Sequence, residues 1–163
     1  MLPSEARLTR RGALLGAASL AALPCFTSGC TRHRPHITTA SENLLDETLA
    51  LEQTLLASYE AALGLVSRRT PLAQTIMLIR AEHLAHRGAL LTAGAKEAPL
   101  PSSTPAPAAL GPGGPRVALA TAENAAATIR VDACARAPRE LAPLLASLAA
   151  SETAHAALLR EAR

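Results

Sequence analysis

The chain has 163 residues, a length typical of a single domain. Apolar residues make up 49% of it and aromatic residues only 1%, and this Ala- and Leu-rich composition favours helices over β-sheet. The formal net charge is +3, but residues 1–29 hold three of the 16 basic and one of the 13 acidic residues, so the remainder carries only +1. A charge that small argues against nucleic-acid binding.

The first 29 residues have the pattern of an export signal. Arg10 and Arg11 stand directly before a short apolar run that ends near Pro24, about half the ~20 residues that a membrane-spanning helix needs. A basic start, a short apolar stretch and a small-residue end are typical of a signal peptide, and paired arginines indicate the twin-arginine route. We therefore expect the protein to be exported.

Cys30 follows this signal in the sequence Ser28-Gly29-Cys30, which resembles a lipobox. In that motif the cysteine is acylated and becomes the new N-terminus, and a diacylated cysteine anchors a protein stably at a membrane. We expect a lipid anchor at Cys30 on the outer face of the cell membrane, followed by a tether over residues 30–40. Without acylation the protein would be secreted, and Cys30 could then form a disulfide with Cys134, which we otherwise expect to be a small buried residue.

Residues 41–67 and 71–93 have the spacing of two bundle helices joined by a short link. The first is predicted to begin at Ser41, with Ser41 as its N-cap. Its stripe recurs in steps of four and three at Leu45, Leu49, Glu52, Leu56, Tyr59, Leu63 and Val66. The second has Thr70 as its N-cap, Pro71 as its first residue and Gly94 as its C-cap. Its stripe is Leu72, Ile76, Ile79, His83, His86, Leu90 and Ala93.

Prolines and glycines crowd residues 95–115, so no helix is expected there, and a segment of that length can run the whole length of a bundle. A third helix is predicted over 116–136. A fourth opens at Pro138, with Pro143 kinking or delaying its first turn, and its stripe is Leu141, Leu145, Leu148, Glu152, His155, Leu159 and Ala162. The connections over residues 41–163 are a short link, a long crossover and a second short link. This order predicts a four-helix bundle with one crossover.

Ionisable residues interrupt the apolar stripes at matching depth. The third helix adds Glu123 among small alanines, and the segment Ala81–His86 aligns with Ala150–His155. A glutamate helix followed by a helix with a Glu- or His-x-x-His motif therefore occurs twice in the chain. The candidate site residues are Glu52, His83, His86, Glu123, Glu152 and His155.

With these residues the sequence resembles the ferritin-like superfamily, whose members bind two iron or manganese ions with one Glu from each of two helices and Glu-x-x-His from the other two. Glu152-x-x-His155 matches that motif, and Glu52 with Tyr59 resembles the first-helix pattern of ferritins. The whole chain is similar to exported bacterial ferritin-like lipoproteins of unknown function. The resemblance implies that the six candidate residues hold iron, zinc or another divalent metal.

Two departures from the family pattern affect the expected chemistry. The second helix presents His83-x-x-His86, so a bridging carboxylate is absent unless Glu82, one position off the stripe, turns inward. Arg130 stands seven residues after Glu123, where the first helix has Tyr59, and could neutralise a carboxylate in place of a metal. The extra imidazole favours zinc, copper or a single iron over an oxygen-rich di-manganese site.

Two functional hypotheses follow. The first is a membrane-tethered metal protein, and the second is a metal-free structural or partner-binding bundle in which the six groups pair with one another and with Arg130. A wrong register, with these groups on the surface, would remove the site altogether. No catalytic constellation beyond a metal centre is visible, so no enzyme activity is assigned, and the sequence indicates no partner except the membrane at Cys30.

Overall fold

The computed structural model describes residues 38–97 and 113–162. Within these ranges the chain forms four helices and no strand: α1 (Thr39–Leu63), α2 (Pro71–Ala93), α3 (Gly114–Arg136) and α4 (Ala142–Glu161). The prediction of an all-α four-helix bundle is therefore confirmed. Among the helices so described, none is long and apolar enough to cross a membrane.

Several predicted features lie outside the described residues. These are the signal peptide over 1–29 with Arg10 and Arg11, the acylation site Cys30, residues 30–37 of the tether, and residues 98–112 of the crossover.

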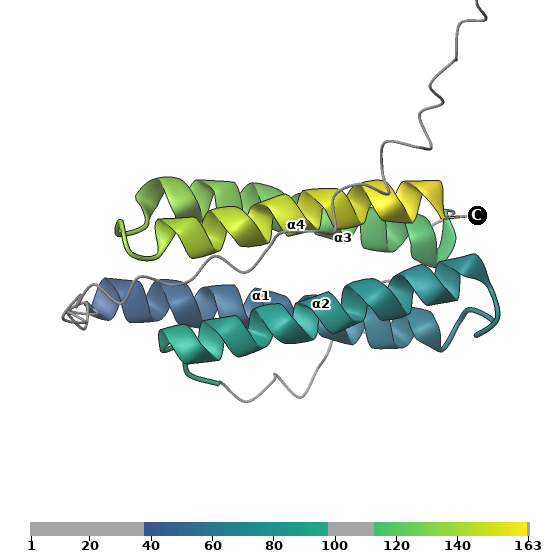
Figure 1. The fold of residues 1–163 in the computed structure, drawn as a ribbon, viewed down its shortest axis with the longest axis horizontal. Coiled ribbons are helices and arrows are strands. Elements are labelled where there is room, and N and C mark those ends of the chain that lie inside the picture. Colours follow the sequence, from purple (N-terminus) through teal and green to yellow (C-terminus); the bar gives the residue numbers. More distant parts are fainter. Residues whose placement is uncertain (1–37, 98–112, 163) are drawn as a thin grey trace, which may run out of the picture. The chain divides into compact units, whose positions relative to one another are not determined.

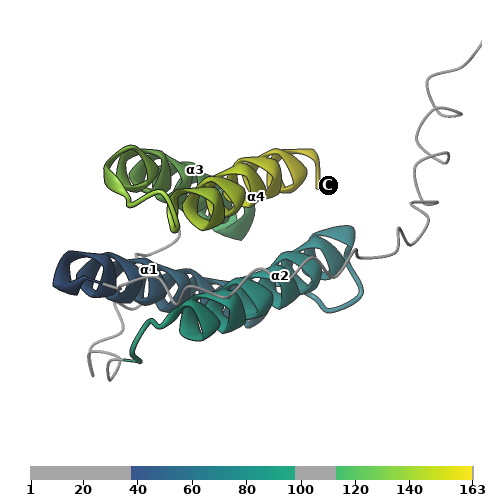
Figure 2. The same cartoon turned by 60° about the vertical axis from the view of Figure 1, so that its left-hand side comes forward.

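The helices form two antiparallel hairpins, α1 with α2 and α3 with α4, that stack as two layers (Figure 1, Figure 2). Across the layers, α1 packs against α3 and α2 packs against α4. The links within the two hairpins lie at opposite ends of the bundle in Figure 1, as do the end of α2 and the beginning of α3. The interior is therefore lined by one face of each of the four helices.

The boundaries of α2 agree with the prediction, because each is set by a local signal. The Thr70 hydroxyl accepts a hydrogen bond from the Ala73 N–H, Pro71 occupies the first turn, and Gly94 takes a left-handed conformation with φ 112°. The predicted boundaries of α1 were wrong at both ends. Thr38 rather than Ser41 caps the N-terminus by accepting the Ser41 N–H, and the helix ends four residues before Ser67.

The second hairpin also differs from the prediction at its helix starts. α3 begins at Gly114, two residues early, where Gly114 has a φ of 66° that suits glycine. α4 begins at Ala142 rather than at Pro138, with Pro143 in its first turn. Proline lacks an N–H and is tolerated there, so the predicted delay of this helix is confirmed. Cys134 is half-buried, and its thiol donates to the Ala142 carbonyl at 3.3 Å.

Apolar side chains fill the two ends of the bundle and leave its middle to polar groups. One end holds Tyr59, Ala62, Ile76, Ile79, Leu119, Ala120 and Leu159. The other end holds Leu45, Leu49, Leu90, Ala95 and Leu148. Between them along the helices lie the buried ionisable residues Glu52, His83, Glu123, Arg130, Glu152 and His155.

At Leu56 the predicted apolar stripe of α1 is off by one residue. Leu55 is only 2% exposed, whereas Leu56 is half-buried. From Glu52 the helix steps three residues to Leu55 and four more to Tyr59, and this spacing keeps all three on the core face.

Candidate metal centre

The six candidate residues come together at one level of the bundle. They are contributed by all four helices: Glu52, His83, His86, Glu123, Glu152 and His155. Five are buried, and His86 keeps 15% of its side chain exposed. Contacts below 4 Å connect the whole set, with Tyr59 and Arg130 as further members. The register that places these groups on the surface is therefore wrong.

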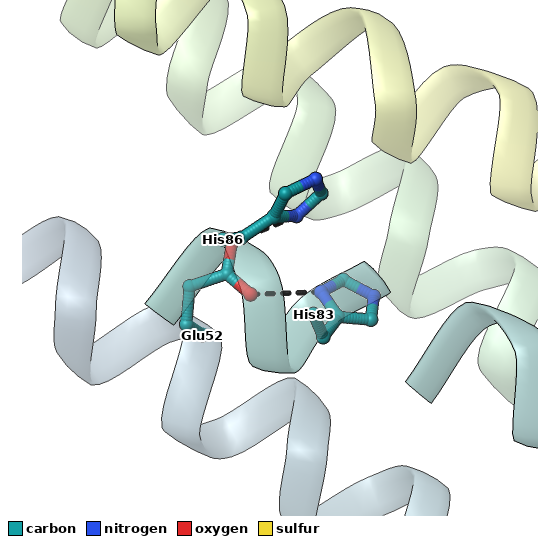
Figure 3. A group of neighbouring side chains, drawn as sticks. All are labelled: Glu52, His83 and His86. Carbon is teal, nitrogen blue, oxygen red and sulfur yellow. Dashed lines mark hydrogen bonds and ion pairs between the residues drawn. The ribbon is translucent and has the colours of Figure 1, made fainter. Parts of the chain in front are cut away.

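His83 joins the two hairpins at the centre of the set. Its Nδ1 lies 2.8 Å from Glu52 Oε2, and its Nε2 lies 2.8 Å from Glu123 Oε1. Figure 3 marks the contact with Glu52 by a dashed line. Burial lowers the pKa of His83, but the hydrogen bonds to Glu123 and Glu52 outweigh it and raise the pKa to about 9. In the metal-free protein the ring is therefore an imidazolium that donates to both carboxylates.

Arg130 lies between two carboxylates on the other side of Glu52. Its Nη2 donates to Glu52 Oε1 at 2.5 Å, and its Nε donates to Glu152 Oε1. The side chain is 1% exposed, so this guanidinium is a fixed positive charge inside the bundle. Burial raises the pKa of Glu152 above its usual value, although the charge of Arg130 opposes this effect.

Tyr59 donates a hydrogen bond to Glu123, as Arg130 does to Glu52. Its hydroxyl donates to Glu123 Oε1 at 2.5 Å. Burial and the charge of Glu123 raise the pKa of Tyr59 above its ordinary value, so the group remains a neutral phenol.

The two glutamates that contact His83 remain ionised although they are buried. Burial raises the pKa of Glu52, but the imidazoles of His83 and His86 and the charge of Arg130 outweigh it and lower the pKa to about 2. Burial likewise acts on Glu123, where the neighbouring imidazoles of His155 and His83 lower the pKa to about 2. Both groups are therefore carboxylates at neutral pH and can act as metal ligands.

Glu82 does not turn inward as a bridging carboxylate. Its side chain stays 49% exposed, and its Oε2 lies 2.7 Å from Nε2 of the buried His155. The other ring nitrogen of His155, Nδ1, faces Glu123 Oε2 at 3.4 Å. Glu82 thus orients a candidate ligand from the surface.

The donor atoms form two groups that share His83. One group is Glu52, His83 and His86, and the other is His83, Glu123 and His155, with ligand atoms within 4.8 Å of one another in each. Glu152 belongs to neither group. Five buried side-chain atoms of the described residues have no hydrogen-bond partner, and all belong to this site: His86 Nδ1, Glu123 Oε2, Arg130 Nη1, Glu152 Oε2 and His155 Nδ1.

The donor set fits a small divalent ion. Four of the five unpartnered atoms are carboxylate oxygens or imidazole nitrogens, which are the ligands that zinc and first-row transition metals prefer. Two ligands at about 2.1 Å from one tetrahedral ion are about 3.4 Å apart. Glu123 Oε2 and His155 Nδ1 have that separation.

The sequence identified these residues but not their pairing. Helix periodicity places a residue on the interior face, but the reach of a long side chain decides which partner it meets. The contact of His83 with both hairpins and the contact of Glu82 with His155 were not predicted.

Comparisons of this chain with known protein families, curated proteins and solved structures find no match. The ferritin-like resemblance therefore depends on the motifs of the sequence and stays a prediction.

Proposed function

We propose that the protein is an exported, membrane-anchored ferritin-like bundle that binds a divalent metal between its two hairpins. Arg10 and Arg11 before a short apolar run, and Cys30 in its lipobox-like sequence, support export and anchoring. The repeated glutamate helices and Glu152-x-x-His155 in a four-helix bundle support the ferritin-like assignment.

A single observation carries the metal-binding proposal. Glu123 Oε2 and His155 Nδ1 are buried and lie within ion-pair distance of one another at 3.4 Å, but neither atom makes a hydrogen bond. A buried polar atom without a partner costs about 1–3 kcal/mol, and more when the group is charged. An ion that is coordinated by both atoms removes this cost, and His83 lies within reach as a further ligand.

The ligand types favour zinc, copper or a single iron. Three imidazoles accompany the three carboxylates, whereas manganese and magnesium prefer sites made of oxygen ligands. Bound iron or copper would supply one-electron redox chemistry, and bound zinc would supply only a Lewis acid. The residues of the chain hold the ion and exclude water from it, since five of the six candidates are buried.

A second candidate function is a metal-free structural or partner-binding bundle. It is favoured by Arg130, whose guanidinium already pairs with Glu52 and Glu152. With the protonated His83, this arginine supplies two cations for three buried carboxylates. Such a network would hold the hairpins together without an ion.

Metal content separates the two functions. The full chain is purified from cells without chelator and analysed for iron, zinc, manganese and copper. It is then stripped and melted with each metal in turn. We expect bound metal in the first experiment and a raised melting temperature in the second, because an ion that binds only the folded state stabilises it. No bound metal and no shift with any of the four would establish the metal-free bundle.

Export and anchoring are tested in the cell. Replacing Arg10 and Arg11 by lysine should leave precursor in the cytoplasm, and unchanged export would exclude the twin-arginine route. Cys30→Ser should release the exported protein from membranes, because the acylated residue is lost. A wild-type protein recovered wholly soluble after export would contradict the lipid anchor.

A further inference from the structure

The two hairpins repeat one another in space as well as in sequence. In the first, Glu52 Oε1 and His86 Nδ1 are 3.6 Å apart. In the second, Glu123 Oε2 and His155 Nδ1 are 3.4 Å apart. The core thus contains two equivalent Glu–His pairs. If the two hairpins were fully symmetric, each pair could hold one ion.

Tyr59 and Arg130 break this symmetry. They occupy equivalent positions, and each crosses to the opposite hairpin, where Tyr59 donates to Glu123 and Arg130 donates to Glu52. Both glutamates also contact His83. Beyond that shared contact, Glu123 is held by a neutral phenol, whereas Glu52 is held by a permanent cation. The Glu123 pair keeps its negative charge for an ion, and the Glu52 pair is already neutralised.

The oxygen atoms of the two glutamates differ in the same way. Both oxygens of Glu52 are engaged, Oε1 by Arg130 and Oε2 by His83. Glu123 uses only Oε1, which contacts Tyr59 and His83, and its Oε2 has no hydrogen-bond partner. Of the two pairs, only Glu123–His155 has both a carboxylate oxygen and an imidazole nitrogen without a hydrogen bond, and these two atoms face one another.

The total charge of the core agrees with a single ion. With Glu152 counted as ionised beside Arg130, three buried carboxylates and one guanidinium leave two negative charges when the imidazoles are neutral, as they are in metal ligands. One divalent ion neutralises these charges. Two ions would leave a double positive charge in a buried layer, which is strongly unfavourable.

We propose that the core binds one divalent ion rather than two, at the Glu123–His155 pair with His83 as the third ligand, and that Arg130 is the permanent cation at the Glu52–His86 pair. This inference rests on the proposed metal-binding function and assigns that function to one half of the site. Arg130 is a positioning residue that limits the stoichiometry of the bundle.

Stoichiometry is the first test. The stripped full chain is dialysed against zinc, and separately against ferrous iron without oxygen, and the bound metal per chain is measured. We expect one ion per chain. Two ions would overturn the single-ion inference and leave the proposed function standing. No bound zinc or iron, together with no melting shift with iron, zinc, manganese or copper, would overturn the proposed function and this inference with it.

A matched pair of histidines tests which half binds the ion. His155→Ala should weaken zinc binding by more than about tenfold, since even residues beside a ligand contribute that much. His86→Ala, its equivalent in the first hairpin, should still bind one ion with an affinity within a few-fold of the wild type. Equal losses in the two variants, or a loss only in His86→Ala, would overturn the assignment.

Substitution of Arg130 tests its role directly. Arg130→Glu gives four buried carboxylates, which two divalent ions balance, and we expect two zinc ions per chain. Arg130→Lys keeps the cation and should still bind one. Circular dichroism confirms that each variant is helical. A folded Arg130→Glu protein with one ion would overturn the role of Arg130. If this variant does not fold, the comparison of His155→Ala with His86→Ala tests the inference instead.

Discussion

Tyr59 and Arg130, at equivalent positions of α1 and α3, donate reciprocal hydrogen bonds across the bundle, each to the core glutamate of the opposite hairpin. His83 adds a third connection, because it contacts Glu52 of its own hairpin and Glu123 of the other. The polar layer therefore joins the two hairpins in the middle of the bundle, between the two apolar clusters. Its stability and the metal binding that we propose depend on the same side chains.

Removing the Tyr59 hydroxyl should destabilise the metal-free protein. Tyr59→Phe keeps the ring in the apolar cluster but deprives the ionised Glu123 of a donor. Hydrogen bonds to charged groups contribute about 1.5–3 kcal/mol, so we expect a loss of that size in urea unfolding. Ser58→Ala is the control, because the Ser58 hydroxyl bonds only to the Thr54 carbonyl in an exposed contact. Equal losses in the two variants would contradict the structural role of Tyr59.

Two adjacent leucines of α1 test the register of the bundle. Leu55→Ala should cost about 2–5 kcal/mol, because Leu55 is buried and its removal leaves a cavity. Leu56→Ala should cost clearly less, because Leu56 is half-buried and solvent can fill the space. Chemical unfolding of both variants provides the comparison. A larger loss for Leu56→Ala would show that α1 is rotated from the orientation described.

The same pair of leucines shows which feature of the fold could not be predicted from the sequence. Local signals predicted α2 correctly because Thr70, Pro71 and Gly94 act within one turn of the chain. Between two adjacent leucines, however, periodicity cannot choose, since both lie near the same stripe. The choice of Leu55 depends on packing against the other helices.

For the site, the sequence predicted which residues belong to it but not how their side chains are arranged. Glu52, Glu123 and the two histidine-containing motifs interrupt apolar stripes at the same depth, and this pattern is visible without a structure. The partners of Arg130 depend on a long side chain that reaches another helix, which no spacing rule describes. The difference in charge between the Glu52–His86 and Glu123–His155 pairs could therefore be recognised only from the side-chain contacts of the structure.

The stability of the chelator-treated protein should depend on pH in both directions. The pKa of His83 is raised from 6.5 to about 9, so its contribution is complete below about pH 6.5 and is lost as the pH rises through 9. The pKa values of Glu52 and Glu123 are lowered from 4.5 to about 2, so their contributions are complete above about pH 4.5 and are lost toward pH 2. Glu152, whose pKa is raised, loses its contribution with rising pH, as His83 does.

The contribution of the network should therefore be largest between about pH 4.5 and 6.5. Denaturant midpoints measured with EDTA across pH 3 to 10 give the profile. His83→Gln is the control, because it removes the titrating ring and should flatten the alkaline limb. A wild-type profile that still rises above pH 8 would contradict the double pairing of His83.

Glu82 should control metal affinity without controlling the fold. When Nε2–H of His155 donates to Glu82, the lone pair of the ring lies on Nδ1, the nitrogen that faces Glu123. Removal of a residue that orients a metal-binding histidine in this way lowers affinity by about 10–100-fold. We therefore expect Glu82→Ala to weaken zinc binding by that factor, measured by competition with a chromophoric chelator.

The matched control for Glu82 is Glu60→Ala. Glu60 is an exposed glutamate of α1 that pairs with Arg80 and does not contact the site. Without metal, Glu60→Ala should unfold close to the wild type, because the pair with Arg80 is largely exposed and such pairs contribute little. Glu82→Ala should remain folded but lose some stability, because Nε2 of the buried His155 loses its partner. Zinc affinity should therefore fall in Glu82→Ala alone. If Glu82→Ala binds zinc as tightly as Glu60→Ala does, the Nδ1 lone pair of His155 does not depend on Glu82, and the Glu123 contact alone orients the ring.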